Sequence, residues 1–127
     1  DRLRAIIDKG LCDYVAMDIK NSPARYPETV GISGFDVSGV RASVALLLEG
    51  RVDYEFRTTV ARELHTAEDI RAIGQWVGGA PRYCIQQFVD SGDLVGHGCT
   101  AVEPLELQAF AEIARPFFGK VELRGID

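Results

Sequence analysis

Residues 13–20 read DYVAMDIK, a run in which charged side chains appear where a buried strand does not need them. Because successive strand residues point to opposite faces, the even-numbered residues of this predicted strand share one face, which ends in Asp18 and Lys20. In parallel α/β sheets and barrels both faces are covered, and functional side chains collect at the C-terminal ends of the strands. Asp18 and Lys20 are therefore either functional groups at such an end or a solvated strand end with a weak ion pair.

Helical and strand patterns alternate on both sides of this run. Upstream, the spacing of Leu3, Ile6 and Ile7 predicts a helix that stops at Gly10. Downstream, the patterns predict a loop at 21–27 that can hold one helical turn, a helix over 37–48 capped by Asp36, a strand over 52–60, a helix from a capping box at 66–69 to 77, a strand over 82–89, a loop over 90–98, a helix over 104–115 and a strand over 120–124. This order is that of successive βαβ units and predicts an α/β fold with a parallel sheet.

The composition predicts one folded domain over residues 1–127, since 46% of the residues are hydrophobic. A formal net charge of −5 and a pI near 5.0 argue against a general electrostatic footprint for nucleic acid or for an anionic membrane surface. The sequence has no apolar run long enough to span a bilayer. It begins in helical rhythm and without Met, so we expect it to be a piece of a longer protein.

The chain has three cysteines, Cys12, Cys84 and Cys99, whose odd number and wide spacing are typical of a reduced, cytoplasmic protein rather than of a secreted disulfide scaffold. We expect them to be buried or chemically indifferent thiols. The two histidines, His65 and His97, lie in polar, loop-like contexts, so we expect both to be solvated and assign them no chemistry. No metal site is predicted within this chain.

Four blocks of sequence resemble a known enzyme family. They are GLCDYVAMDIK at 10–20, YPETVG at 26–31, YEFRTTV at 54–60 and IQQF at 85–88. In these blocks the chain resembles the C-terminal half of radical S-adenosylmethionine (radical SAM) activating enzymes, most of all the activating proteins of anaerobic ribonucleoside-triphosphate reductase. The resemblance implies the C-terminal half of a partial (β/α)6 TIM-type barrel, with these strands as its fourth, fifth and sixth. The N-terminal half, with a CxxxCxxC loop that holds a [4Fe-4S] cluster, would precede this chain.

The resemblance also implies an activity for the complete protein. It would reductively cleave S-adenosylmethionine, with electrons from a donor protein, and the 5′-deoxyadenosyl radical would take hydrogen from a glycine of a glycyl radical enzyme, anaerobic ribonucleotide reductase. This chain alone is expected to hold no cofactor and to be inactive. Two alternatives stay open. One is a formate-lyase-type activator or another radical SAM enzyme, and the other is a non-catalytic α/β binding module in which Asp18 and Lys20 are only a structural pair.

Four residues are predicted to contact the cofactor. Its amino-acid tail carries an ammonium and a carboxylate, for which Asp18 and Lys20 offer one complementary charge each. The resemblance adds Thr58, at a place where related formate-lyase activators commonly have His, and Gln86 in preference to Gln87. Arg57 is expected to be structural.

A barrel that begins at its fourth strand leaves one edge of that strand unpaired. The run at 13–20 has no proline and no charge that blocks the edge before Asp18. We also expect Tyr14, Tyr54 and Phe56 to face the open interior, where they would expose apolar surface. The sequence therefore predicts that the chain self-associates.

Overall fold

Helices and strands alternate along the chain, as predicted. The structure is a computed structural model that describes residues 2–11, 13–88 and 100–125. The helices are α1 (Arg2–Asp8), α2 (Tyr26–Val30), α3 (Ser38–Leu48), α4 (Ala67–Val77) and α5 (Pro104–Ala114), with the 3-10 turns η1 (Pro23–Arg25) and η2 (Arg115–Phe117). The strands are β1 (Tyr14–Asp18), β2 (Asp53–Val60), β3 (Arg82–Gln87) and β4 (Lys120–Arg124). Within the described residues, no helix is long and apolar enough to cross a membrane.

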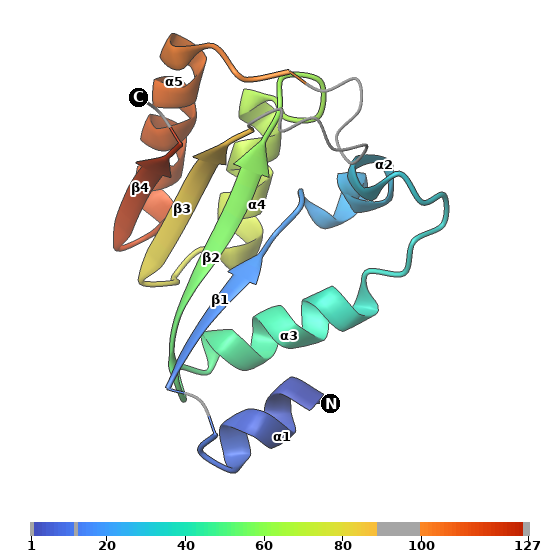
Figure 1. The fold of residues 1–127 in the computed structure, drawn as a ribbon, viewed down its shortest axis with the longest axis vertical. Helices are drawn as coiled ribbons and strands as arrows, with labels where there is room; N and C mark the ends of the chain where they lie inside the picture. Colours follow the sequence, from blue (N-terminus) through green and yellow to red (C-terminus); the bar gives the residue numbers. More distant parts are fainter. Residues whose placement is uncertain (1, 12, 89–99, 126–127) are drawn as a thin grey trace.

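The four strands form one parallel sheet in the order β1-β2-β3-β4. Because neighbours in the sheet are also successive in the chain, each connection leads to the adjacent strand. Figure 1 shows all four arrows pointing the same way, with α4 and α5 behind the sheet. This arrangement is that of part of a (β/α) barrel, and it confirms the predicted fold class.

One face of the sheet carries the hydrophobic core. Its strand residues include Tyr54, Phe56, Val60, Tyr83 and Ile85. The helices α3, α4 and α5 add Val44, Leu46, Leu47, Ile70, Ile73, Val77, Leu107, Phe110 and Ala114. Fully burying one large apolar side chain stabilises the fold by about 1.5–3 kcal/mol. The folded state is therefore favoured when the helices cover the sheet face that carries these residues.

The predicted facing of the aromatic residues was wrong in part. In the register of β1 and β2, Val15 pairs with Tyr54 and Met17 with Phe56, so both aromatic side chains lie on the helix-covered face. Tyr54 is 5% exposed and Phe56 is fully buried, whereas Tyr14, on the opposite face, is 43% exposed. The two large side chains bury more apolar area under helices than an open face offers, and this decides their side of the sheet.

Local hydrogen bonds lie at the starts of α3 and α4. At α4 the predicted capping box is present, because Thr66 Oγ1 accepts from the Asp69 amide and the Asp69 carboxylate accepts from the Thr66 amide at 2.8 Å. At α3 the predicted cap was wrong in detail. The N-cap residue is Val37, and Asp36 lies one residue earlier, where its carboxylate accepts from the Ser38 amide at 2.9 Å.

Candidate functional site

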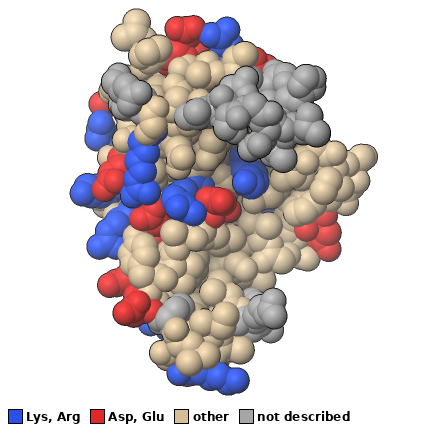
Figure 2. Space-filling view, in the orientation of Figure 1, with Lys and Arg blue, Asp and Glu red and all other residues tan. Residues whose placement is uncertain are grey.

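The sheet face opposite the core is lined by charged and polar side chains, and we call it the ionic face. The register aligns Asp18 with Arg57, Arg57 with Cys84, and Gln86 with Arg124 across neighbouring strands. The residues of this face that the site uses are Tyr14, Asp18, Glu55, Arg57, Cys84, Gln86, Glu122 and Arg124, and Asp53, Arg82 and Lys120 lie on the same face at the opposite ends of their strands. Figure 2 shows acidic and basic side chains alternating across the middle of this face. Charges of both signs therefore meet on one open side of a barrel-like sheet.

Asp18 lies at the C-terminal end of β1 and pairs with Arg57 rather than with Lys20. Arg57 Nε lies 3.3 Å from Asp18 Oδ1, and the Asp18 side chain is 53% exposed. The two atoms are close enough for an ion pair, but they make no hydrogen bond. Arg57 Nε is buried and has no hydrogen-bond partner of acceptable geometry within the described residues. Arg57, which was expected to be structural, therefore lies on the ionic face, and its Nε–H is a donor without an acceptor among the described residues. The carboxylate beside it, that of Asp18, is accessible to solvent.

Glu55 is the most buried charge on the ionic face. Its side chain is 10% exposed, and the Tyr14 hydroxyl donates to Oε1 at 2.6 Å. This hydrogen bond to Glu55 raises the pKa of Tyr14, which keeps the phenol protonated as the donor. Arg124 Nη1 lies 3.5 Å from Oε2, but Oε2 accepts no hydrogen bond among the described residues. Glu55 thus leaves one acceptor atom unused at the centre of the face.

Cys84 is the cysteine that the structure describes, and it is 2% exposed. Burial raises the pKa of its thiol, so Cys84 stays protonated at neutral pH, which confirms the prediction of a buried thiol. Cys12, Cys99 and His97 lie outside the described residues. Within the described part of the chain, no group of three or more His, Cys, Asp or Glu side chains can hold a metal ion.

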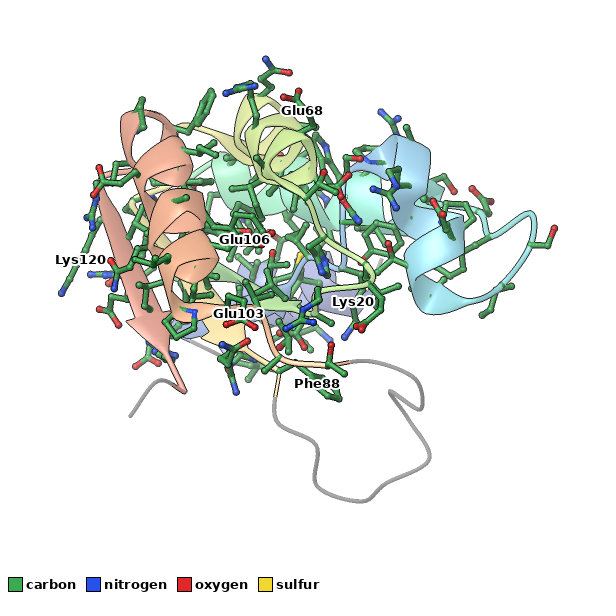
Figure 3. The ribbon with its side chains drawn as sticks, turned by 90° about the horizontal axis from the view of Figure 1, so that it is seen from above. Lys20, Glu68, Phe88, Glu103, Glu106 and Lys120 are labelled. Carbon is green, nitrogen blue, oxygen red and sulfur yellow. The ribbon has the colours of Figure 1, made fainter. Side chains whose placement is uncertain are left out.

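Lys20 lies beyond the end of β1, because the strand ends at Asp18 and not at residue 20 as predicted. Its amide donates to the Tyr26 hydroxyl at 3.3 Å, and its carbonyl lies 2.8 Å from Nε2 of His65. The side chain of Lys20 is exposed. In the view onto the C-terminal ends of the strands, Lys20 lies on the side of the sheet near α2 (Figure 3). The backbone amide and carbonyl of Lys20 are therefore both hydrogen-bonded, while its ammonium lies in solvent.

His65 is not solvated as predicted but is 2% exposed. Beside it, Asn21 is fully buried, and its amide nitrogen donates to the Leu64 carbonyl at 3.1 Å and to the Thr29 hydroxyl at 2.9 Å. These buried polar groups satisfy one another, as burial requires. The sequence shows one local sign of this network, since Asn21 and Ser22, which follow the strand, are residue types that commonly cap turns. It does not show that Asn21 binds the turn that contains Leu64.

Thr58 and Gln86 lie on opposite faces of the sheet. Thr58 is fully buried on the helix-covered face, where its hydroxyl accepts from the Tyr83 hydroxyl at 2.6 Å, so the position lends no support to a cofactor contact by this side chain. Gln86 is exposed on the ionic face. Gln87 instead binds the backbone carbonyl and amide of Val102 at 2.7 and 2.9 Å. The predicted difference in facing between the two glutamines is confirmed.

Comparison with known proteins leads to activating enzymes. No protein-family model matches the chain. It is 28% identical over 130 residues to a protein of Methanocaldococcus jannaschii named "Putative glycyl-radical enzyme activating enzyme", and the match covers 98% of this chain and 54% of that protein. The chain thus spans about half the length of its curated relative.

The fold is similar to a solved domain of pyruvate-formate lyase-activating enzyme from Bacteroides vulgatus. The TM-score is 0.74, and the match covers 97% of this chain and 74% of that domain. The sequences are 11% identical in this match, so the likeness is one of fold. In sequence and in fold, the chain is therefore similar to proteins named as activating enzymes, the group that its four sequence blocks resemble.

Proposed function

We propose that this chain is the cofactor-orienting C-terminal part of a radical SAM activating enzyme that acts on a glycyl radical enzyme. One observation carries the proposal. At the C-terminal end of the open sheet face, a solvent-accessible carboxylate, Asp18, lies beside the underused donor of Arg57, and Lys20 follows two residues later with its peptide held on both sides. Functional groups of parallel barrels collect at this edge.

The residues at this edge fit the tail of S-adenosylmethionine. Asp18 is complementary to the tail's ammonium, and Lys20 and Arg57 are complementary to its carboxylate. Gln86 adds a neutral donor and acceptor on the same face. The buried Arg57 Nε without a hydrogen bond is the kind of atom that a bound carboxylate would satisfy. When bound, the cofactor supplies the source of the 5′-deoxyadenosyl radical, and the protein supplies binding and orientation.

A [4Fe-4S] cluster does not fit the described residues. Such clusters are held by cysteine thiolates, whereas Cys84 is the described cysteine and its thiol is buried and protonated. We assign cluster binding to a part of the complete protein outside residues 1–127, so this chain is the portion of the barrel that lacks the cluster-binding half. The length of the curated relative, which this chain spans by 54%, is consistent with that division.

The proposed work of the ionic face is an exchange of charge partners. Without cofactor, Arg57 neutralises Asp18, and the exposed position of Asp18 keeps this pair weak, at about 0–1 kcal/mol. A bound ammonium would take the place of Arg57 at Asp18, and the guanidinium would turn to the carboxylate of the same ligand. Glu55, held by Tyr14 and facing Arg124, fixes the charges deeper in the face and does not change partners.

The test is a calorimetric titration of S-adenosylmethionine into the full-length protein that contains this chain. Asp18→Asn and Lys20→Met should each weaken binding roughly tenfold, because a hydrogen bond to a charged group contributes about 1.5–3 kcal/mol. Neither should lower the melting temperature by more than a few degrees, since both side chains are exposed. The matched controls Asp53→Asn and Lys120→Met remove the same charges at the opposite ends of β2 and β4 and should leave affinity unchanged.

Wild-type affinity in both site variants would assign Asp18 and Lys20 a structural part only. Absence of binding by the wild-type protein would favour the non-catalytic α/β binding module.

The likeness to a domain of pyruvate-formate lyase-activating enzyme supports a formate-lyase-type activator as the second candidate. We propose anaerobic ribonucleotide reductase as the partner, on the sequence blocks at 10–20 and 54–60. Electron paramagnetic resonance of the glycyl radical formed on each partner protein would separate the two.

A further inference from the structure

His65 closes a turn on itself and binds a second loop at the same time. The amide of His65 donates to the Ala61 carbonyl at 3.1 Å, and the Ala61 amide donates back to Nδ1 of His65 at 3.2 Å. Because Nδ1 accepts this hydrogen bond, the ring proton resides on Nε2, which donates to the Lys20 carbonyl at 2.8 Å. One neutral imidazole thus connects the loop that follows β2 to the loop that follows β1.

Burial favours the neutral form of this imidazole. His65 is 2% exposed, and the loss of solvation lowers its pKa. The charged groups that act on the ring are Asp69 of α4 and Arg25 of η1, whereas Lys20 meets the ring through its backbone carbonyl. Asp69 and Arg25 already form an ion pair with each other at 2.6 Å, which leaves little net charge beside the ring. Both nitrogens of the neutral ring are therefore used, one as acceptor and one as donor.

The turn at 61–65 is anchored on its other side too. Arg62 donates its amide to the Thr100 carbonyl at 2.9 Å, and the Glu63 carboxylate accepts from the Thr100 amide and hydroxyl at 2.7 and 2.6 Å. Thr100 precedes α5, so the segments that follow β1, β2 and β3 all meet at this one turn. A turn that is fixed from two sides can hold the Lys20 peptide in a defined place.

We propose that His65 is a positioning residue, which as a neutral imidazole fixes Lys20 at the C-terminal edge of the sheet so that its ammonium meets the carboxylate of the cofactor. The inference rests on the proposed function for the identity of the ligand, but not for the tie between the two loops. His65 touches no reacting group in this account. It acts through the peptide of Lys20, whose amide is held by Tyr26 and whose carbonyl is held by the imidazole.

Two neutral substitutions separate the two hydrogen bonds of the ring. In His65→Gln the longer amide places an N–H near the site of Nε2 and keeps a donor for the Lys20 carbonyl. In His65→Asn the shorter amide places an oxygen near the site of Nδ1, so it keeps the acceptor for the Ala61 amide and loses the tie to Lys20. Both variants lose the ring, so their difference reports the tie and not the loss of packing.

The experiment uses the full-length protein and has two readouts. In S-adenosylmethionine titrations, His65→Asn should bind roughly tenfold more weakly than wild type, and His65→Gln within about threefold, because a buried carbonyl left without its donor loses more than one with an altered donor. In cofactor-free protein, the amides of Lys20 and Ser22 should exchange with solvent roughly tenfold faster in His65→Asn than in His65→Gln. The amide of Ile85, in β3, is the internal reference.

A double substitution tests whether His65 acts through Lys20. In a Lys20→Met background, His65→Asn should cause no further loss of affinity, because the group that it positions is gone. A further loss of the same size, or equal losses in the Asn and Gln variants, would overturn the positioning role. Unchanged exchange at Lys20 in His65→Asn would also overturn it, even if the wild type binds the cofactor. The predicted exchange pattern without wild-type binding would leave the tie standing and reject the proposed function.

Discussion

Thr58 and Tyr83 make a hydrogen bond that belongs to the core. Tyr83 is 1% exposed, and its hydroxyl donates to the Thr58 hydroxyl at 2.6 Å. Burial raises the pKa of this phenol. Thr58→Val, which keeps the shape of the side chain, should therefore destabilise the protein by about 1–3 kcal/mol, because it leaves the Tyr83 hydroxyl without an acceptor. Urea unfolding measures this loss, and S-adenosylmethionine affinity of the full-length protein should not change.

The control is the pair of substitutions Thr58→Val and Tyr83→Phe. Removing both partners leaves no buried polar group unpaired, so the double variant should recover part of the stability lost in Thr58→Val. The opposite result, lost affinity with unchanged stability, would make Thr58 a cofactor contact as the sequence resemblance implies.

At the residue scale, the sequence locates charges better than it locates their partners. The sequence predicts that Asp18 lies at the end of a strand, because the interior of a buried strand does not need an ionised side chain. Its partner Arg57 could not be predicted, since the register between strands depends on the whole sheet. His65 was missed because its burial arises from the closure of two loops far apart in sequence, and nothing in the residues around it signals that contact.

At the element scale, periodicity predicted the secondary structure well because each helix and strand has one apolar side. The pattern at 52–60 gave two alternating sets of residues in β2, but alternation alone does not say which set the helices cover. The aromatic residues Tyr54 and Phe56 were assigned to the open side, and the larger apolar area buried under the helices places them on the other side. The capping box of α4 could be predicted because its hydrogen bonds join residues that are close in sequence, and the structure confirms it.

A glycine inside α4 is explained by the turn that packs on it. A methyl group at Gly74 would lie 2.3 Å from Cδ2 of Phe117, which belongs to η2. Alanine improves helix propensity by about 1 kcal/mol, but overpacking of this kind costs about 1–3 kcal/mol. Gly74→Ala should therefore destabilise the protein by about 1 kcal/mol in thermal or urea unfolding.

The sign of this effect should reverse when the ring is removed. In a Phe117→Ala background the new methyl group meets no ring, and Gly74→Ala should then stabilise the protein through helix propensity alone. A stabilising effect of Gly74→Ala in the otherwise unchanged protein would show that η2 does not pack on α4 as described.

At the scale of the whole molecule, β1 is an edge of the sheet. The sheet order leaves the side of β1 away from β2 without a partner strand among the described residues. The Ile19 amide donates to the Arg57 carbonyl, so the amides of alternate residues, including Ala16, point away from β2. The open face itself is ionic rather than apolar, so the edge of β1 is the feature that predicts self-association.

We expect the 127-residue chain to associate with increasing concentration in light scattering. Ala16→Pro should reduce this association, because proline removes an outward donor and leaves the β1–β2 hydrogen bonds in place. Ala24→Pro is a matched control outside the sheet, in η1. A chain that stays monomeric over a wide concentration range, with the outward amides of β1 protected from exchange, would show that the edge is covered in another way.

We propose that this chain orients S-adenosylmethionine in a radical enzyme whose cluster is held elsewhere in the complete protein. The most direct measurement is the release of 5′-deoxyadenosine after anaerobic reconstitution with iron and sulfide, followed by reduction, for the full-length protein and for residues 1–127 side by side. We expect release by the full-length protein, a strong reduction of this release in its Asp18→Asn variant, and no release by the 127-residue chain. Release by the 127-residue chain alone, or none by a full-length protein that has assembled its cluster, would contradict the proposal.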